Sequence, residues 1–163
     1  MKQSRPLRPT LWIEQGRAFT WDQTKLPFER LAIALASSED CAQAIAGMKV
    51  RGAPLIGAVA ALGMAMAIDE ALQEHPSSYL HSDWLGALAK PLLATRPTAV
   101  NLAWGIQQVC TAVSKAQDEY SLQAWQSALA LIEADKTCNH AIGIQTQTVL
   151  REQAERATVQ RPL

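Results

Sequence analysis

Apolar residues fall at helical spacing along most of this chain. One strongly apolar run without charged residues, Gly52–Ile68, contains 17 residues, fewer than the roughly 20 that a membrane-spanning helix needs. Pro54 near its start favours a helix beginning there, because a proline in the first helical turn removes no intrahelical hydrogen bond. We therefore expect a buried helix over about 54–72, with the other helices packed around it.

Four further stretches repeat their apolar residues every three to four positions, as one face of a helix requires. Ser37 and Asp40 are placed to form a capping box for the first, and Pro91 should kink or end the second. A last helix should begin near Asp135 and continue past Leu150. The four repeats are Cys41, Ala44, Ile45 and Met48; Leu80, Trp84, Leu88 and Leu92; Leu102, Ile106, Val109 and Val113; and Leu122, Trp125, Leu129 and Ile132.

The beginning of the chain has a different pattern. Two short apolar runs flank Gln15-Gly16 within residues 10–22, which predicts a β-hairpin. The predicted fold is mainly α: a single domain over 1–163, with a β-hairpin region at 1–30 and about four to six helices over 37–160. No parallel sheet is expected in it.

Charge and cysteine content exclude several classes of function. The 163 residues include 15 basic and 15 acidic side chains, so we expect neither a nucleic-acid nor a membrane partner. No apolar stretch follows the basic residues at the N-terminus, so no secretory signal is expected. Three widely spaced cysteines indicate neither a disulfide framework nor a zinc site and fit a cytoplasmic protein, and no metal or cofactor is required. Three histidines lack partners at catalytic spacing: His75, His81 and His140.

Two arginines stand directly before predicted helices. Arg51, Gly52 and Ala53 lead into the long apolar helix, and Arg96 precedes a proline that opens another. Helix N-termini direct free N–H groups at anions, Gly52 allows close approach of a ligand, and an arginine can bind phosphate in a bidentate manner. These four residues are therefore candidates for a phosphate site. The alternative is that the arginines pair with carboxylates beside ordinary turns.

Four motifs together resemble the methylthioribose-1-phosphate isomerase family. Two are MKVRGAPLIGAVAALGMA (48–65), with Leu55 where alanine is usual, and RPTAVNLAWGI (96–106). WDQTKLP (21–27) resembles the family's L-D-Q-x-x-L-P with a tryptophan first, and DKTCNHAIG (135–143) resembles its D-x-x-x-N-x-x-I-G helix. The family carries out an aldose–ketose isomerisation in methionine salvage. It shares its fold with regulatory subunits of translation initiation factor 2B and with ribose-1,5-bisphosphate isomerase.

The resemblance implies a cytoplasmic, homodimeric enzyme that converts 5-methylthioribose 1-phosphate to 5-methylthioribulose 1-phosphate. Residues 1–163 would form its helical N-terminal domain, and a Rossmann-like domain would follow. Arg51, Gly52 and Ala53 would hold the substrate phosphate, and Arg96 would also contact the substrate. The family's catalytic cysteine and aspartate are expected beyond residue 163, so this fragment should be inactive.

Cys138 superficially resembles the family's catalytic cysteine, which lies in a T-H-C-N-x-G segment. The motif D-x-x-x-N-x-x-I-G matches the same stretch better, so we interpret Cys138 as a structural residue within a helix. Two other functions remain open. One is a regulatory protein of the same fold that binds a sugar phosphate or nucleotide without turnover, and the other is a helical interaction domain.

Overall fold

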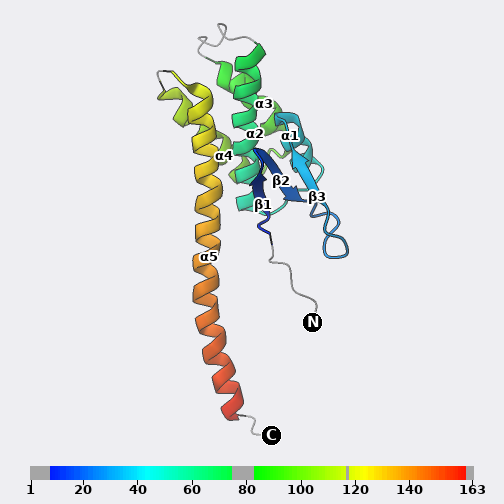
Figure 1. Cartoon of the computed structure of the whole chain (residues 1–163), viewed down its shortest axis with the longest axis vertical. Coiled ribbons are helices and arrows are strands. Elements are labelled where there is room, and N and C mark those ends of the chain that lie inside the picture. Colours follow the sequence, from blue (N-terminus) through cyan, green and yellow to red (C-terminus); the bar gives the residue numbers. More distant parts are fainter. Residues whose placement is uncertain (1–7, 75–82, 117, 161–163) are drawn as a thin grey trace. The chain divides into compact units, whose positions relative to one another are not determined.

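The computed structural model describes residues 8–74, 83–116 and 118–160, with side chains up to residue 156 (Figure 1). The chain divides into two compact units, 1–132 and 133–163, which are described in turn. The described residues form five helices and one three-stranded antiparallel sheet near the N-terminus. The predicted fold class, mainly α with a small N-terminal β element, is confirmed.

The sheet begins with the predicted hairpin. Strands β1 (Leu11–Glu14) and β2 (Arg17–Trp21) pair in antiparallel fashion around Gln15 and Gly16, whose φ angles are 52° and 75°. Two consecutive residues with positive φ are typical of a two-residue hairpin turn. A third strand, β3 (Ala32–Leu35), pairs with β2. The predicted limit of residue 30 for the β region was therefore wrong, because two of the four residues in this short strand are alanines, which are not strong β-formers.

The connection between β2 and β3 is held at its base by a buried aspartate. The Asp22 carboxylate accepts hydrogen bonds from the Thr24 backbone N–H at 3.0 Å and from the Thr24 hydroxyl at 2.6 Å. These bonds from Thr24 hold the pKa of Asp22 below its ordinary value. The Gln23 N–H donates to the Lys49 carbonyl at 2.9 Å. This bond joins the sheet to the segment that leads into the long apolar helix.

The predicted central helix is confirmed. It is α2, in which every residue from 55 to 68 is buried. Among the described helices only α2 is long and apolar enough to cross a membrane, and 83% of its most apolar window is buried within the protein, as in a core helix. Figure 1 shows α1, α3 and α4 around it. The helices are α1 (Ser38–Ala46), α2 (Ala53–Glu74), α3 (Trp84–Thr95), α4 (Val100–Ser114) and α5 (Tyr120–Gln160).

The start of α1 contains half of the predicted capping box. The Ser37 hydroxyl accepts from the Asp40 N–H at 3.0 Å, as predicted. The Asp40 carboxylate, however, accepts from the Ala36 N–H rather than from the N–H of Ser37. Met48, predicted to extend the buried stripe of this helix, lies beyond its end at a φ of 60° and is 39% exposed. The helix ends before Met48 because Gly47 forms its C-cap.

Pro91 does not end α3, which continues to Thr95. The turn after Pro91 contains the fully buried Leu92, and burial of this side chain outweighs the loss of one backbone hydrogen bond. Leu80, predicted to lie at the beginning of this helix, falls outside the described residues, as do His75 and His81. The apolar face predicted for α4 is confirmed, since all four of its residues are buried: Leu102, Ile106, Val109 and Val113.

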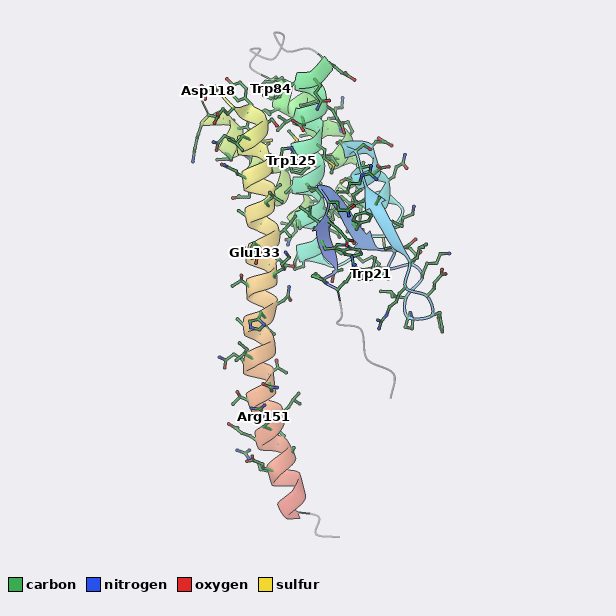
Figure 2. The ribbon with its side chains drawn as sticks, in the orientation of Figure 1. Trp21, Trp84, Asp118, Trp125, Glu133 and Arg151 are labelled. Carbon is green, nitrogen blue, oxygen red and sulfur yellow. The ribbon has the colours of Figure 1, made fainter. Side chains whose placement is uncertain are left out.

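Two predicted helices at the C-terminal end form one, α5. No glycine or proline occurs between residues 120 and 142, so nothing interrupts the helix. The predicted buried face was also wrong in part, because Leu122 and Leu129 are exposed. The Ser121 hydroxyl and the Trp125 ring N–H donate to the Asp69 carboxylate at 2.5 and 3.3 Å, which turns a different face of α5 toward α2. Figure 2 labels Trp125 on this helix. The residues buried on that face are Ala124, Ala128 and Ile132.

The second unit is a single helical segment, and its side chains from residue 136 to 156 are exposed (Figure 2). A lone helix has no other element of its own unit against which to bury side chains. Cys138 lies within this helix, as the D-x-x-x-N-x-x-I-G motif predicted, and its thiol is free.

The backbones of α2 and α4 come into close contact where the two helices cross. A Cβ atom added to Gly105 would overlap the carbonyl oxygen of Gly57, and one added to Gly57 would lie 3.0 Å from the carbonyl oxygen of Asn101. Two backbones can approach this closely only where both helices lack a side chain. The two glycines therefore set the distance between these helices.

Replacing Gly105 with alanine should destabilise the protein by about 1–3 kcal/mol or more, because the added methyl group forces the helices apart. Urea or thermal unfolding followed by circular dichroism measures the change. Gly143→Ala is the matched control, since its Cβ would meet nothing within 4 Å. This control should be neutral or stabilising by up to about 1 kcal/mol. Equal effects of both substitutions would contradict the interpretation of the crossing.

Candidate functional site

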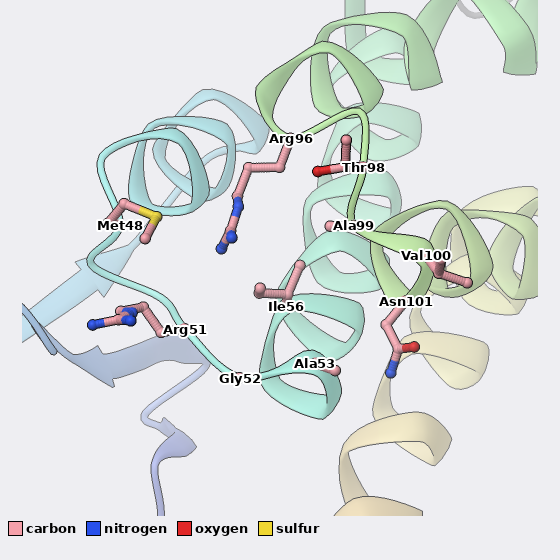
Figure 3. A pocket seen from close by; sticks show the side chains of 10 residues that line it. All are labelled: Met48, Arg51, Gly52, Ala53, Ile56, Arg96, Thr98, Ala99, Val100 and Asn101. Carbon is pink, nitrogen blue, oxygen red and sulfur yellow. The ribbon is translucent and has the colours of Figure 1, made fainter.

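A cavity of about 360 Å³ lies between the N-terminal turns of α2 and α4 (Figure 3). It includes all four residues that the sequence singled out, which come from two segments separated by more than forty positions. The chain therefore brings the two Arg-containing helix starts together in one place. The lining residues are Met48, Arg51, Gly52, Ala53, Ile56, Arg96, Thr98, Ala99, Val100 and Asn101.

The α2 side of the cavity is shaped by an unusual backbone between α1 and α2. Val50 is fully buried, and its N–H donates to the Ala44 carbonyl at 3.1 Å, which anchors the segment. Gly52 has a φ of 89°, a region that other residues avoid, and nothing lies within 4 Å of its missing side chain. The Gly52 carbonyl accepts from the Ile56 N–H at 3.0 Å and so begins α2. A ligand can thus approach the backbone of this helix start.

The α4 side is a tight turn that begins at Arg96, the C-cap residue of α3. The prediction that Pro97 opens a helix was wrong, because Pro97 lies in this turn and α4 begins only at Val100. The Ala99 N–H donates to the Arg96 carbonyl at 2.9 Å, and the Leu102 N–H donates to the Ala99 carbonyl at 2.9 Å. Ala99 is the N-cap residue, and its methyl side chain cannot accept a hydrogen bond from the first turn. The N-terminus of α4 is therefore left without a side-chain cap where it meets the cavity, as an anion site requires.

Neither arginine of the cavity has a carboxylate partner within the described part of the chain. The ion pairs found there are Arg8–Glu14 and Lys136–Glu133. The lining contains no aspartate or glutamate, so its formal charge comes from Arg51 and Arg96 alone. The partner that the alternative interpretation of these arginines requires is thus absent from the described residues.

A second cavity, of about 590 Å³, has the opposite character. Its lining includes the Asp69 and Glu70 carboxylates with a single arginine, Arg17. An anion entering it would meet more negative than positive charge. Of these two cavities, the one between α2 and α4 is the better place for a phosphate, although its volume is smaller.

The two arginines enter the first cavity differently (Figure 3). The Arg96 side chain extends from the turn before α4 toward the space between α1 and α2, whereas the Arg51 side chain extends away from α4. Arg51 is exposed, so it can change rotamer at little cost. The structure therefore brings both residues to one cavity without bringing their guanidinium groups face to face.

Several lining residues were not recognised as site residues from the sequence. The sequence predicted Met48 and Ile56 as buried helix residues. It gave no role to three other lining residues: Thr98, Val100 and Asn101. Ile56, Val100 and Asn101 lie in the first turns of α2 and α4, and this position could have marked them as site residues. The convergence of these turns could not be inferred from spacing along the chain.

The described residues offer no cluster of three or more His, Cys, Asp or Glu side chains that could hold a metal ion. The surroundings of Cys41 and Cys110 do not activate their thiols. Burial raises the pKa of the Cys41 thiol to about 12, and burial also raises the pKa of Cys110. Since the thiolate is the reactive form of cysteine, neither of these two groups is an activated nucleophile.

The chain matches the family model described as "Initiation factor 2 subunit family" over residues 49–159. It is 36% identical over 155 residues to a protein of Rhodospirillum rubrum described as "Uncharacterized protein in petC 3'region", covering 93% of this chain and 80% of that protein. It is also 36% identical over 155 residues to the methylthioribose-1-phosphate isomerase of the same species, covering 93% of this chain but only 38% of the isomerase.

Two crystal structures have a similar fold. The delta subunit of translation initiation factor eIF-2B from A. fulgidus superposes with a TM-score of 0.63 at 35% identity, covering 77% of this chain and 37% of that chain. The 5-methylthioribose 1-phosphate isomerase of Pyrococcus horikoshii superposes with a TM-score of 0.64 at 29% identity, and the match covers 79% of this chain and 37% of the isomerase. The family match includes more than half of this chain and both arginines of the cavity. The protein therefore belongs to the initiation factor 2 subunit family.

Proposed function

We propose that the cavity between α2 and α4 binds the phosphate group of a sugar phosphate. The observation that carries this proposal is the presence of two arginines without carboxylate partners among the described residues, in one cavity that lacks acidic side chains. The N-terminus of α4, which has no side-chain cap, adds the positive end of a helix dipole. These groups together provide the charge and the donors that a phosphate requires.

The substrate class follows from the relatives. Several proteins that are 36–39% identical to this chain are named methylthioribose-1-phosphate isomerase, and the chain spans 36–39% of their length. We therefore propose that a whole protein containing this domain converts 5-methylthioribose 1-phosphate to 5-methylthioribulose 1-phosphate. Methionine salvage, a cytoplasmic location and a homodimer are parts of the same proposal.

The reaction explains why a phosphate site is needed. A 1-phosphate holds the sugar as a closed ring, so the ring must open before hydrogen moves from C2 to C1. This isomerisation has no net oxidation or reduction and consumes no second substrate. Arg51 and Arg96 would fix the phosphate and thereby position C1, and their charge would stabilise negative charge that develops during ring opening. The acid and base groups would come from a following domain.

A second candidate function is a regulatory protein that binds the same ligand class without turnover. The similarity in fold to the eIF-2B delta subunit of A. fulgidus favours it. Both functions use the anion site, so binding alone does not distinguish them. Catalysis by the whole protein does.

Replacing either arginine of the cavity with alanine should weaken phosphate binding by on the order of 2–3 kcal/mol, because each removes a charge-assisted contact. Titration calorimetry of the chain with 5-methylthioribose 1-phosphate measures this loss. Arg51→Lys and Arg96→Lys should restore part of it, since an ammonium group lacks the bidentate geometry. The double variant should lose less than the sum of the single variants if both side chains hold one anion.

Arg17→Ala is the matched control, because Arg17 is exposed and lines the other cavity. It should leave phosphate binding unchanged. Unfolding temperatures of all variants should stay close to that of the parent, since these side chains support no core. Unchanged binding in Arg51→Ala and Arg96→Ala, or a large fall in their unfolding temperatures, would contradict the phosphate site.

Residues 1–163 alone should bind 5-methylthioribose 1-phosphate without converting it, because the acid and base groups are proposed to lie in a following domain. Product formation followed by ³¹P NMR measures turnover. A longer protein that contains this domain and a following α/β domain should convert the substrate. Turnover by residues 1–163 would disprove the division of roles, and binding without turnover by the longer protein would favour the regulatory function.

A further inference from the structure

We propose that Thr98 and Asn101 are specificity-determining residues that bind hydroxyl groups of the ligand held by the two arginines. The inference rests on the proposed anion site and names the residues that would recognise the group attached to the phosphate. It predicts that a phosphate ester with several hydroxyl groups binds more tightly than one without them.

The lining of the cavity separates into three kinds of side chain. Arg51 and Arg96 carry the charge, and Thr98 and Asn101 are the uncharged polar residues. The other lining residues are a glycine and apolar side chains, such as Ile56. Thr98 and Asn101 are therefore the uncharged side chains of this lining that could bind a neutral polar group.

Neither polar side chain is used by the fold. Within the described part of the chain, the Thr98 hydroxyl and the Asn101 amide make no hydrogen bond to another residue. Other threonines near the helices do have such bonds: the Thr95 hydroxyl donates to the Leu92 carbonyl at 2.6 Å, and Thr111 accepts from Gln107 at 3.2 Å. The hydrogen-bonding capacity of Thr98 and Asn101 is thus available to a ligand.

These two residues also supply what the rest of the site lacks. Arginine side chains and free helix N–H groups only donate hydrogen bonds, which suits the oxygens of a phosphate. The Thr98 Oγ1 and Asn101 Oδ1 atoms are the side-chain oxygens of the lining, and they accept hydrogen bonds. A bare phosphate dianion has no proton to give them. A sugar hydroxyl can both donate to these oxygens and accept from the same side chains.

Their position connects them to the anion. Thr98 lies directly before the N-cap residue Ala99, and Asn101 lies one turn further on, in the first turn of α4. In Figure 3 the Thr98 hydroxyl is on the side of the Arg96 side chain, and the Asn101 amide is nearer to Ala53. A group attached to a phosphate at the N-terminus of α4 would therefore lie in the same cavity as these two side chains.

The experiment compares two phosphate monoesters, ribose 1-phosphate and methyl phosphate, by titration calorimetry with the full chain. Ribose 1-phosphate should bind the parent protein more tightly. Thr98→Val keeps the shape of the side chain but removes its hydroxyl, and should weaken ribose 1-phosphate binding about 3- to 10-fold, the usual value of one or two hydrogen bonds. Binding of methyl phosphate should not change. Asn101→Ala should have the same selective effect.

Two further variants serve as controls. Thr98→Ser retains the hydroxyl and should keep most of the affinity for ribose 1-phosphate. Thr111→Val makes the same substitution on α4 outside the cavity and should change neither ligand. Unfolding temperatures of all these variants should match that of the parent.

The outcomes separate this inference from the anion site. If the parent binds both esters equally, or if Thr98→Val and Asn101→Ala weaken both esters to the same extent, the hydroxyl-binding role is wrong and the anion site stands. If the parent protein binds neither ester, the anion site is wrong and the inference falls with it.

Discussion

The close contact of two helix backbones at Gly57 and Gly105 is the constraint on which this domain depends. The Gly57 backbone also lies against the Asn101 carbonyl, in the first turn of α4. Gly57 itself is one turn from the beginning of α2 at Ala53. The crossing therefore occurs next to both helix N-termini, and the packing that stabilises the core also brings the Arg51 and Arg96 segments to one cavity. The contact between Gly57 and Gly105 therefore contributes both to the packing of the core and to the formation of the cavity.

The charge distribution follows from the same arrangement. Arginines near one another repel unless an anion or a carboxylate lies between them. Neither arginine of the cavity pairs with an acidic residue in the described part of the chain. Two carboxylates with low exposure have hydrogen-bond partners outside the cavity: Asp22 accepts from Thr24, and Asp69 accepts from Ser121 and Trp125 of α5. Because these carboxylates lie outside the cavity, its lining carries positive charge only.

Family membership and function rest on different evidence. The family match and the relatives of 36–39% identity assign the chain to its family. The chain is similar both to proteins named as isomerases and to the eIF-2B delta subunit of A. fulgidus, so a shared fold does not by itself select a reaction. The two arginines of the cavity carry the proposal of a phosphate site, and the names of the relatives carry the proposed substrate.

The sequence by itself determined the helices with strong apolar periodicity, the hairpin at Gln15-Gly16 and the start of α2 after Arg51 and Gly52. Helical period, turn residues and capping preferences act over only a few neighbouring positions, so they can be read from the sequence. Only the tertiary structure decided the features that depend on distant partners. Helix α3 continues beyond Pro91 because Leu92 is buried in the core. The hydrogen bonds from Ser121 and Trp125 to Asp69 determine which face of α5 is buried. The meeting of the N-termini of α2 and α4 at one cavity also depends on tertiary structure. It requires the two helices to cross, and the spacing of residues along the chain does not determine how helices cross.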